Sequence, residues 1–310
     1  MNAFPDIRLA AGDDSVLPFQ VGESAVRGRL VRLGAAIDAI LGAHPFPPSV
    51  KELLGEAAAL VAMMGAALKF DGKLILQAQG DGPVSMLVAD YSAKGNLRAT
   101  ASAAPGAESA RGLGALLGRG HLAMTIDQGP DTDRYQGVTA IEGASLAEAA
   151  VAYFNQSEQI PTAVKLAVGR VARPGQAEAW RAGGIIAQFV PPEGGRARGE
   201  SAFAGSEDRE TWDRAAAHLA TTAADELLDP SLDAETLLYR LYHEDGVRVF
   251  GASPVRARCS CNAQKIAAVL GRYSKDDLAE MVENGVIRVR CEFCRAAYDF
   301  DKSGKRAAAS

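Results

Sequence analysis

The chain holds four cysteines, and all of them lie in its last fifth as two close pairs. Cys259 and Cys261 form a CxC motif, and Cys291 and Cys294 form a CxxC motif. Four sulfurs spaced in this way can fill the tetrahedral coordination sphere of a zinc ion, or they can close two short disulfides on oxidation. Because the same atoms cannot do both at once, a chain with this pattern can serve as a redox switch.

A zinc ion held by four sulfurs has no open position for water, which argues against catalysis by the metal. The plainest alternative is a zinc ribbon that only folds the C-terminal part of the chain. Two features favour a switch. Neighbouring cysteines in these motifs lie within reach of disulfide geometry, and flanking cations are expected to favour the thiolate form that oxidants attack. These cations are Arg256, Arg258, Arg288, Arg290 and Arg295.

The elements that must position the sulfurs form a small unit. Asn262 and Ser274 are suitable N-caps for two short helices. Two short strands are expected at residues 286–290 and 297–300, on either side of the CxxC motif. This unit has few large apolar residues, so it is expected to need a metal or a disulfide in order to fold.

Residues 1–190 are predicted to form an α+β core domain of antiparallel sheet with helices. Pro47 and Pro48 precede a long apolar helix that ends near Leu68. Short strands separated by Gly-rich turns follow, as antiparallel hairpins require. The predicted strands span residues 16–21, 73–79, 84–90, 97–101, 121–127, 135–142, 162–171 and 184–190, a capped helix spans 145–157, and 112–118 is interpreted as a turn.

Residues 191–240 are predicted to be a helical, metastable linker. After a Pro- and Gly-rich opening, Trp212, Ala216, Leu219, Ala223 and Leu227 recur at the spacing of one helix. Alanine gains much less on burial than the ~1.5–3 kcal/mol of a large apolar side chain, so this helix is expected to be marginally stable. The linker leads into a zinc-binding redox-switch domain over residues 241–302, and residues 303–310 are expected to be a disordered tail.

The net charge of −5 is unevenly distributed. Residues 193–245 hold thirteen acidic side chains against five basic ones, and residues 256–295 hold eight basic against five acidic. The chain therefore offers no broad basic face for a phosphate backbone, and nucleic acid is not an expected partner.

Catalytic and membrane signals are weak or missing in the sequence. No GxxxxGK[ST], GxSxG or HExxH motif occurs, so no enzyme activity is predicted. Asp127 and Glu158 are a conceivable acid pair and His243 a conceivable spare metal ligand, but ordinary solvated or packed side chains are the better interpretation. The N-terminus lacks a secretory pattern, and the longest apolar run, residues 57–68, is shorter than the ~20 residues of a membrane helix. We expect a soluble, cytoplasmic protein with no membrane partner.

Several stretches of the chain resemble the heat-shock protein 33 family, the bacterial redox-regulated chaperonins. The resemblance covers nearly the whole chain and extends well beyond the cysteines. It rests on Leu241–Phe250, Val255–Cys261, Val289–Cys294, Gln79–Pro83, Tyr135–Val138, Ser145–Ala149, Tyr153–Thr162 and Ala182–Gly184.

This resemblance implies an ATP-independent holdase that is inactive when reduced. It implies one zinc ion per chain, held by Cys259, Cys261, Cys291 and Cys294. Oxidation then forms the disulfides Cys259–Cys261 and Cys291–Cys294, releases zinc, unfolds the linker and zinc domain, and yields an active homodimer that binds unfolded client proteins. The residues themselves leave two alternatives open: a thiol-disulfide oxidoreductase using the CxxC motif, and a zinc-ribbon adaptor for protein or nucleic acid.

Overall fold

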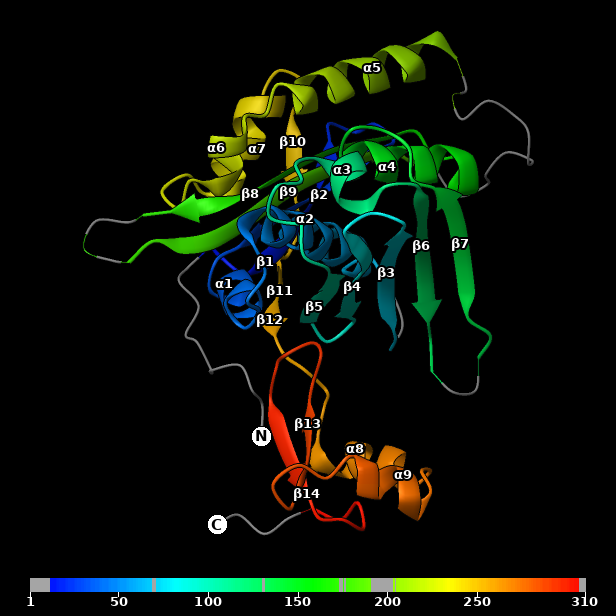
Figure 1. Cartoon of the computed structure of the whole chain (residues 1–310). Helices are drawn as coiled ribbons and strands as arrows, with labels where there is room; N and C mark the ends of the chain where they lie inside the picture. Colours follow the sequence, from blue (N-terminus) through cyan, green and yellow to red (C-terminus); the bar gives the residue numbers. More distant parts are fainter. Residues whose placement is uncertain are drawn as a thin grey trace. The chain divides into compact units, whose positions relative to one another are not determined.

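The structure is a computed structural model that describes residues 12–68, 71–129, 132–172, 175, 177–190, 203 and 205–306. It divides into two compact units, one ending at Ala257 and the other beginning at Arg258. The elements of the first unit (Figure 1) are β1 (Ser15–Val21), β2 (Val26–Leu33), α1 (Ala35–Gly42), α2 (Pro48–Gly65), β3 (Lys73–Gly80), β4 (Val84–Ser92), β5 (Asn96–Ala103), α3 (Leu113–Leu117), β6 (Gly120–Asp127), β7 (Tyr135–Ala140), α4 (Leu146–Tyr153), the π-helix η1 (Phe154–Glu158), β8 (Thr162–Val171), β9 (Ala179–Phe189), α5 (Ser206–Ala220), α6 (Ala224–Leu228), α7 (Ala234–Tyr242), β10 (Val247–Val249), β11 (Ser253–Pro254) and β12 (Arg256–Ala257).

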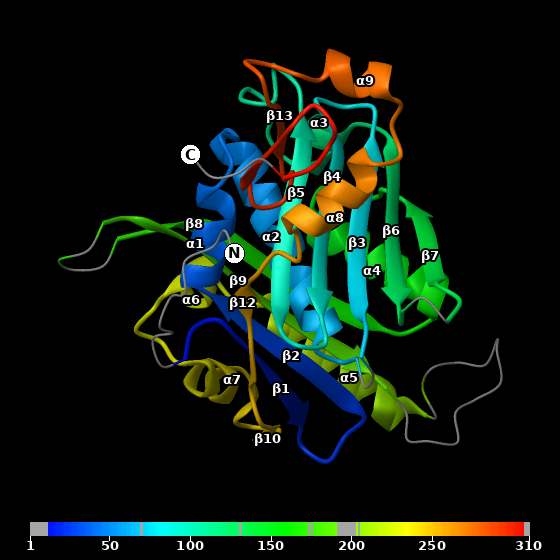
Figure 2. The same ribbon diagram turned by 90° about the horizontal axis from the view of Figure 1, so that it is seen from below.

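Two sheets with helices between and outside them build the first unit. The first sheet has the strand order β10-β1-β2-β9-β8, and β11 also pairs with β1. The second has the order β12-β5-β4-β3-β6-β7, and Figure 2 shows its longer strands side by side. Except for β12, which runs parallel to β5, neighbouring strands are antiparallel. The predicted α+β class with antiparallel sheets and helices is confirmed.

Helix α2 forms the layer between the sheets, because it contacts strands of both. Pro48 starts it at a position where the missing N–H costs nothing. Small residues then allow close approach: a Cβ on Gly55 would lie 2.8 Å from a methyl group of Val168 on β8. The helix is buried along most of its length, as its apolar sequence predicts.

Some elements of the first unit differ from the prediction. Strand β2 and helix α1 were not foreseen, since the sequence of β2, VRGRLVRL, alternates apolar and basic residues and resembles a solvent-facing segment. The stretch 112–118, interpreted as a turn, contains the short helix α3. The other predicted strands and helices of this unit are present, with ends that shift by a few residues.

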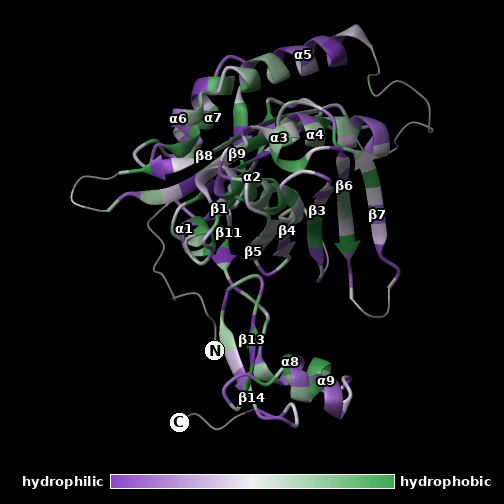
Figure 3. Cartoon of the chain, viewed as in Figure 1, coloured by the Kyte–Doolittle hydropathy of each residue, from purple (hydrophilic) through white to green (hydrophobic). Residues whose placement is uncertain are grey.

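Helices α5, α6 and α7 cover the face of the first sheet that points away from α2 (Figure 1). Their buried side chains and those of the sheet form one apolar cluster, here called the linker cluster. Helix α5 contributes few large residues to it, and Figure 3 colours much of α5 as hydrophilic. Members from the helices are Trp212, Ala215, Leu219, Leu227, Ala234, Leu237, Leu238, Leu241 and Tyr242, and members from the sheet include Leu17, Phe19, Leu30, Ile185 and Phe189.

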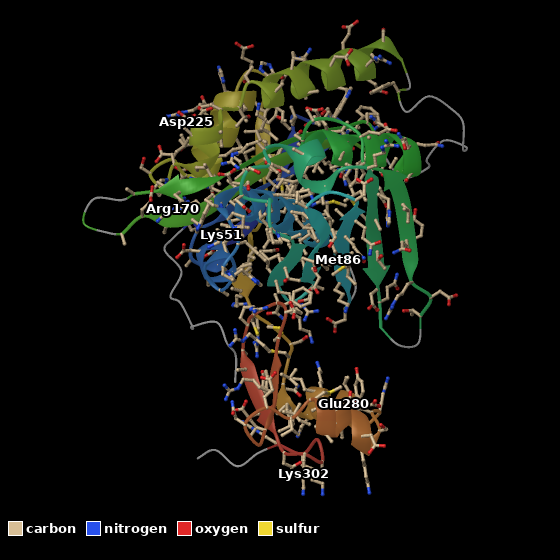
Figure 4. The ribbon with its side chains drawn as sticks, viewed as in Figure 1. Lys51, Met86, Arg170, Asp225, Glu280 and Lys302 are labelled. Carbon is tan, nitrogen blue, oxygen red and sulfur yellow. The ribbon has the colours of Figure 1, made fainter. Side chains whose placement is uncertain are left out.

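The prediction of one continuous helix through Leu227 was wrong. Helix α5 ends at Ala220, and α6 begins at Ala224 after a residue with extended backbone. Ala223, assigned to the buried stripe, is exposed. Asp225, labelled in Figure 4, lies on the short helix α6. The opening of the predicted linker, residues 191–202, lies outside the described residues.

The second unit contains α8 (Ala263–Leu270), α9 (Lys275–Glu280), β13 (Ile287–Arg290) and β14 (Ala297–Phe300). The two predicted caps are present, since Asn262 accepts from the N–H of Lys265 and Ser274 accepts from that of Asp277. Its apolar cluster is small and is built around Leu270, Leu278, Ile287 and Phe300. Figure 4 labels Glu280 at the end of α9 and Lys302 after β14.

The start of the predicted tail is folded back on this unit. The N–H of Asp301 donates to the carbonyl of Lys305 at 2.8 Å, and Arg306 forms a β-bridge with Phe300. Residues 307–310 lie outside the described residues.

Candidate metal centre

The cysteines of the second unit come from two loops. Cys259 and Cys261 lie in the extended segment before α8, and Cys291 and Cys294 lie in the turn that joins β13 to β14. That turn is closed by backbone hydrogen bonds: the N–H of Cys291 donates to the carbonyl of Ala296, and the N–H of Arg295 donates to the carbonyl of Cys291, each at 2.9 Å. The antiparallel pairing of β13 and β14 therefore fixes the CxxC motif as a knuckle.

The four sulfur atoms converge, and all lie within 4.8 Å of one another. The closest contacts run between the motifs, with Cys259 Sγ 3.7 Å from Cys291 Sγ and Cys261 Sγ 3.4 Å from Cys294 Sγ. A tetrahedral zinc ion with Zn–S bonds of ~2.3 Å would set its sulfurs about 3.8 Å apart. The number, type and spacing of the donors therefore fit zinc.

The pKa values of Cys291 and Cys294 are both raised. Burial raises the pKa of Cys294 to about 12. Its hydrogen-bonded contact with Cys259, followed by burial, also raises the pKa of Cys291. Cys259 and Cys294 are buried, and the other two are half-buried. A bound metal ion would offset these costs and hold the sulfurs as thiolates.

Two of the five flanking arginines, Arg288 and Arg295, form ion pairs with acidic side chains. Arg288 forms a two-bond ion pair with Asp299, at 2.7 and 2.9 Å, and Arg295 lies 3.5 Å from Glu292. Carboxylates thus neutralise these two cations, while the pKa values of Cys291 and Cys294 are raised. At Cys291 and Cys294, burial and contacts between the thiols outweigh the flanking arginines. That the five arginines favour thiolates across the whole cluster stays a prediction.

Tyr298 is a neighbour of the cluster that sequence reasoning missed. Its hydroxyl lies 3.2 Å from Cys261 Sγ and donates to the Cys261 carbonyl at 3.4 Å. Burial and then the Cys261 contact raise the pKa of Tyr298. The sequence did place Tyr298 on the strand that returns from the CxxC motif, and alternate side chains of a strand share one face. That position was the signal from which a contact with the cysteines could have been predicted.

The three other candidate residues from the sequence, His243, Asp127 and Glu158, each have local partners and form no shared site. His243 caps the end of α7, with its Nδ1 3.3 Å from the carbonyl of Arg240. Asp127 forms ion pairs with Lys73 and Arg134, each at 3.5 Å. Glu158 is engaged elsewhere, by two tyrosine hydroxyls, so no acid pair exists between it and Asp127.

Two core arginines hold the linker through backbone carbonyls, and sequence reasoning did not foresee them. Arg181 of β9 donates to the Leu228 carbonyl at 2.8 Å and forms a two-bond ion pair with Asp13, at 2.8 and 2.6 Å. Arg32 of β2 donates to the carbonyls of Leu232 and Asp229. We call these contacts the arginine attachment. They fix the end of α6 and the turn that follows it.

Comparison with known proteins covers nearly the whole chain. A family model described as Hsp33 protein matches residues 14–301. A 33 kDa chaperonin of Caulobacter vibrioides is 48% identical over 300 residues, which cover 94% of this chain and 96% of that protein. A 33 kDa chaperonin of Pseudomonas syringae pv. tomato is 37% identical over 311 residues, covering 97% and 93%.

A solved structure shares the fold. The crystal structure of a 33 kDa chaperonin from Thermotoga maritima aligns with a TM-score of 0.75, covering 94% of this chain and 96% of that one. Its sequence identity is 20%, so this likeness speaks to the fold alone.

Proposed function

The chain belongs to the Hsp33 family, and from that premise we propose that it is a redox-regulated, ATP-independent holdase that keeps unfolding client proteins from aggregating. Membership places it among chaperonins and not among enzymes. The observation that carries the regulatory part is the convergence of four cysteine sulfurs within 4.8 Å in a unit with a small apolar cluster.

In the reduced state, Cys259, Cys261, Cys291 and Cys294 would hold one zinc ion. When bound, zinc would keep the sulfurs as thiolates and link the segment before α8 to the β13–β14 knuckle. Because the apolar cluster of this unit is so small, metal binding supplies a large share of its folding free energy. Loss of the metal should therefore unfold the unit.

Oxidation by peroxide would remove the donors in pairs. Two thiolates would lose two electrons and form one S–S bond, while H₂O₂ would take up those electrons with two protons from solvent and become two water molecules. We propose the pairs Cys259–Cys261 and Cys291–Cys294, as the family resemblance implies. In the reduced geometry the nearest sulfurs belong to different motifs, at 3.4 and 3.7 Å. Pairing within each motif therefore requires the sulfurs to move relative to one another.

Release of the linker would then expose a client surface. Helices α5, α6 and α7 cover apolar side chains of the first sheet, among them Phe19 and Phe189, which are 1% and 2% exposed. We propose that residues 191–240 act as the metastable cover, that residues 241–302 act as the switch, and that the oxidised chain is an active homodimer in the cytoplasm. In the part of the chain that the structure describes, none of the helices combines the length and the apolar composition of a membrane span.

The test is a titration with hydrogen peroxide at raised temperature that follows zinc release and light scattering by a thermally unfolding client. We expect zinc release and suppression of aggregation to rise together. Cys291→Ser should leave the first unit folded but lower the zinc content and abolish the reversible switch. Ser260→Ala, inside the CxC motif but not a sulfur donor, is the matched control. Unchanged zinc content and regulation in Cys291→Ser would contradict the proposal.

The disulfide pairing has its own test, because trypsin sites separate the motifs. Cleavage after Arg258 and Lys265 releases both cysteines of the CxC motif on one peptide, and cleavage after Arg290 and Arg295 releases both cysteines of the CxxC motif on another. Pairing within motifs leaves each peptide alone and 2 hydrogens lighter, by about 2 Da. Crossed pairing would link the two peptides into one species.

The raised pKa of the CxxC cysteines weighs against a thiol-disulfide oxidoreductase, whose attacking cysteine needs a lowered pKa. Catalytic turnover in an insulin-reduction assay would instead support the oxidoreductase. Tight, salt-sensitive binding of nucleic acid by the reduced chain would instead favour the zinc-ribbon adaptor.

A further inference from the structure

A cavity of about 510 Å³ lies in the first unit, where α2 ends between the two sheets. The first sheet contributes residues of β2 and β9 to its wall, and the second contributes residues of β3, β6 and β7. The volume falls within the ~300–1,000 Å³ usual for small-molecule sites. Most of the wall is apolar, and it includes Met64, Leu68, Leu74, Met124, Ile126 and Phe154.

One guanidinium group stands in this apolar wall. Arg29 of β2 is half-buried, and among the described residues no carboxylate or hydrogen-bond acceptor pairs with its side chain. Burial lowers the pKa of Arg29, and no neighbouring charge opposes that shift. The other core arginines described above, Arg32 and Arg181, are both paired. A desolvated cation of this kind is stabilised by an anion that brings it two hydrogen bonds.

Among the described residues of the wall there is one acid, and it is already engaged. Glu158 Oε1 accepts from the hydroxyls of Tyr135 and Tyr153, at 3.1 and 3.3 Å. Glu158 ends the π-helix η1, and the next residue, Gln159, has a left-handed backbone with φ of 56°. Such π-helical turns are frequent at functional sites. The two tyrosines thus hold Glu158 at the wall, which leaves Arg29 as the group that a ligand would meet.

We propose that this cavity binds a medium-chain aliphatic carboxylate, with its carboxylate on Arg29 and its chain against the apolar wall. Aliphatic and methionine side chains suit a flexible alkyl chain, because methionine adapts to irregular shapes. Ligand entry is open at the rim, where Ala67 is exposed and Tyr135 is 50% exposed. This site is separate from the cysteine cluster, and the proposal does not depend on the redox function.

The test is calorimetric titration of the full, reduced chain with dodecanoate. We expect one saturable site per chain. Arg29→Met keeps the apolar volume and removes the charge, so it should weaken binding at least tenfold. Arg27→Met is the matched control, since Arg27 lies on the same strand, is exposed and is not part of the wall. Dodecanol, which lacks the carboxylate, should bind the native chain as weakly as dodecanoate binds the Arg29→Met variant.

A second variant covers the case in which Arg29→Met does not fold. Ala67→Trp places a large side chain at the exposed rim and should block dodecanoate while leaving the thermal unfolding midpoint nearly unchanged. Equal dodecanoate affinity in the native chain and either folded variant would overturn the proposal. So would binding of several molecules per chain without saturation, which would indicate association with general apolar surface.

Discussion

Gly183 offers the sharpest way to disturb the linker without touching the cysteines. It lies on β9 beneath α6, and a Cβ there would meet the Leu227 carbonyl oxygen at 2.5 Å and the Leu227 Cβ at 3.0 Å. Gly183 does not have a left-handed backbone, so alanine is compatible with its strand conformation. Gly183→Ala should therefore push α6 outward and leave the sheet intact.

The size of the effect follows from the crowding. The clash is with backbone, which cannot turn aside as a side chain can, so overpacking should cost ~1–3 kcal/mol. Since that cost falls on the docked linker, the undocked fraction should rise by ~5- to 150-fold. Leu227, only 1% exposed in the native chain, would lose part of its contact with the sheet.

Hydrogen exchange read by mass spectrometry measures this directly. Amides of α6 should exchange faster in Gly183→Ala by about the same factor, with the zinc content of the chain unchanged. Light scattering of an unfolding client should show partial holdase activity in the reduced variant, or activation at a lower peroxide concentration.

Gly169→Ala on β8 is the matched control. A Cβ there would meet only the free end of the Leu228 side chain, at 3.1 Å, which can rotate away. Its exchange and activity should resemble those of the native chain. If Gly183→Ala behaved like Gly169→Ala in both assays, close packing on β9 would not be what holds the linker.

Three other substitutions test the arginine attachment, the N-cap of α7 and the hydroxyl beside the cysteine cluster. Arg181→Met removes a buried ion pair and a hydrogen bond to the linker, so the free energy of unfolding of the first unit should fall by ~3 kcal/mol in chemical denaturation; a change below ~1 kcal/mol would count against the arginine attachment. Hydrogen bonds from Thr236 hold the pKa of Asp233 below its usual range. The stability that Asp233 gives to α7 is therefore fully present above the unfolded-state pKa of ~3.9, and it is lost as the pH falls through the lower pKa of the folded state. Asp233→Asn, which accepts the same bond without titrating, should show a smaller loss of thermal stability between about pH 5 and pH 3 by circular dichroism, and an equal loss would contradict this assignment. Tyr298→Phe removes the hydroxyl next to Cys261, so peroxide should release zinc faster from the reduced chain, and an unchanged release rate would show that the hydroxyl does not shield that sulfur.

Elements whose signal is local could be predicted from the sequence. The caps at Asn262 and Ser274, the apolar run of α2 and the alternating strands of the second sheet each depend on a few neighbouring residues. The cysteine motifs likewise predict their own convergence, because two close pairs on a small unit have few other ways to pack. That they bind zinc and form the stated disulfides stays a prediction.

Features that depend on distant partners could not be predicted. Strand β2 contains three arginines and therefore looks polar in the sequence. The groups that accommodate them are not local, since Arg32 donates to carbonyls about two hundred residues further along the chain. The break between α5 and α6 was missed because the stripe was read as continuous, whereas the buried positions are Trp212, Ala215 and Leu219 and then Leu227. The acidic partners of Arg288 and Arg295 were likewise not apparent from the spacing of the basic residues.

The arginine attachment has a consequence for how the linker can vary in sequence. On the linker side, the acceptors at positions 228, 229 and 232 are main-chain carbonyls, which every amino acid carries. Substitution of the linker's side chains therefore leaves these bonds available as long as the backbone follows the same path. The core therefore binds the backbone conformation of the linker and not its side chains. The side chains of the linker, and with them the ease of its release, can vary while the point of attachment stays the same.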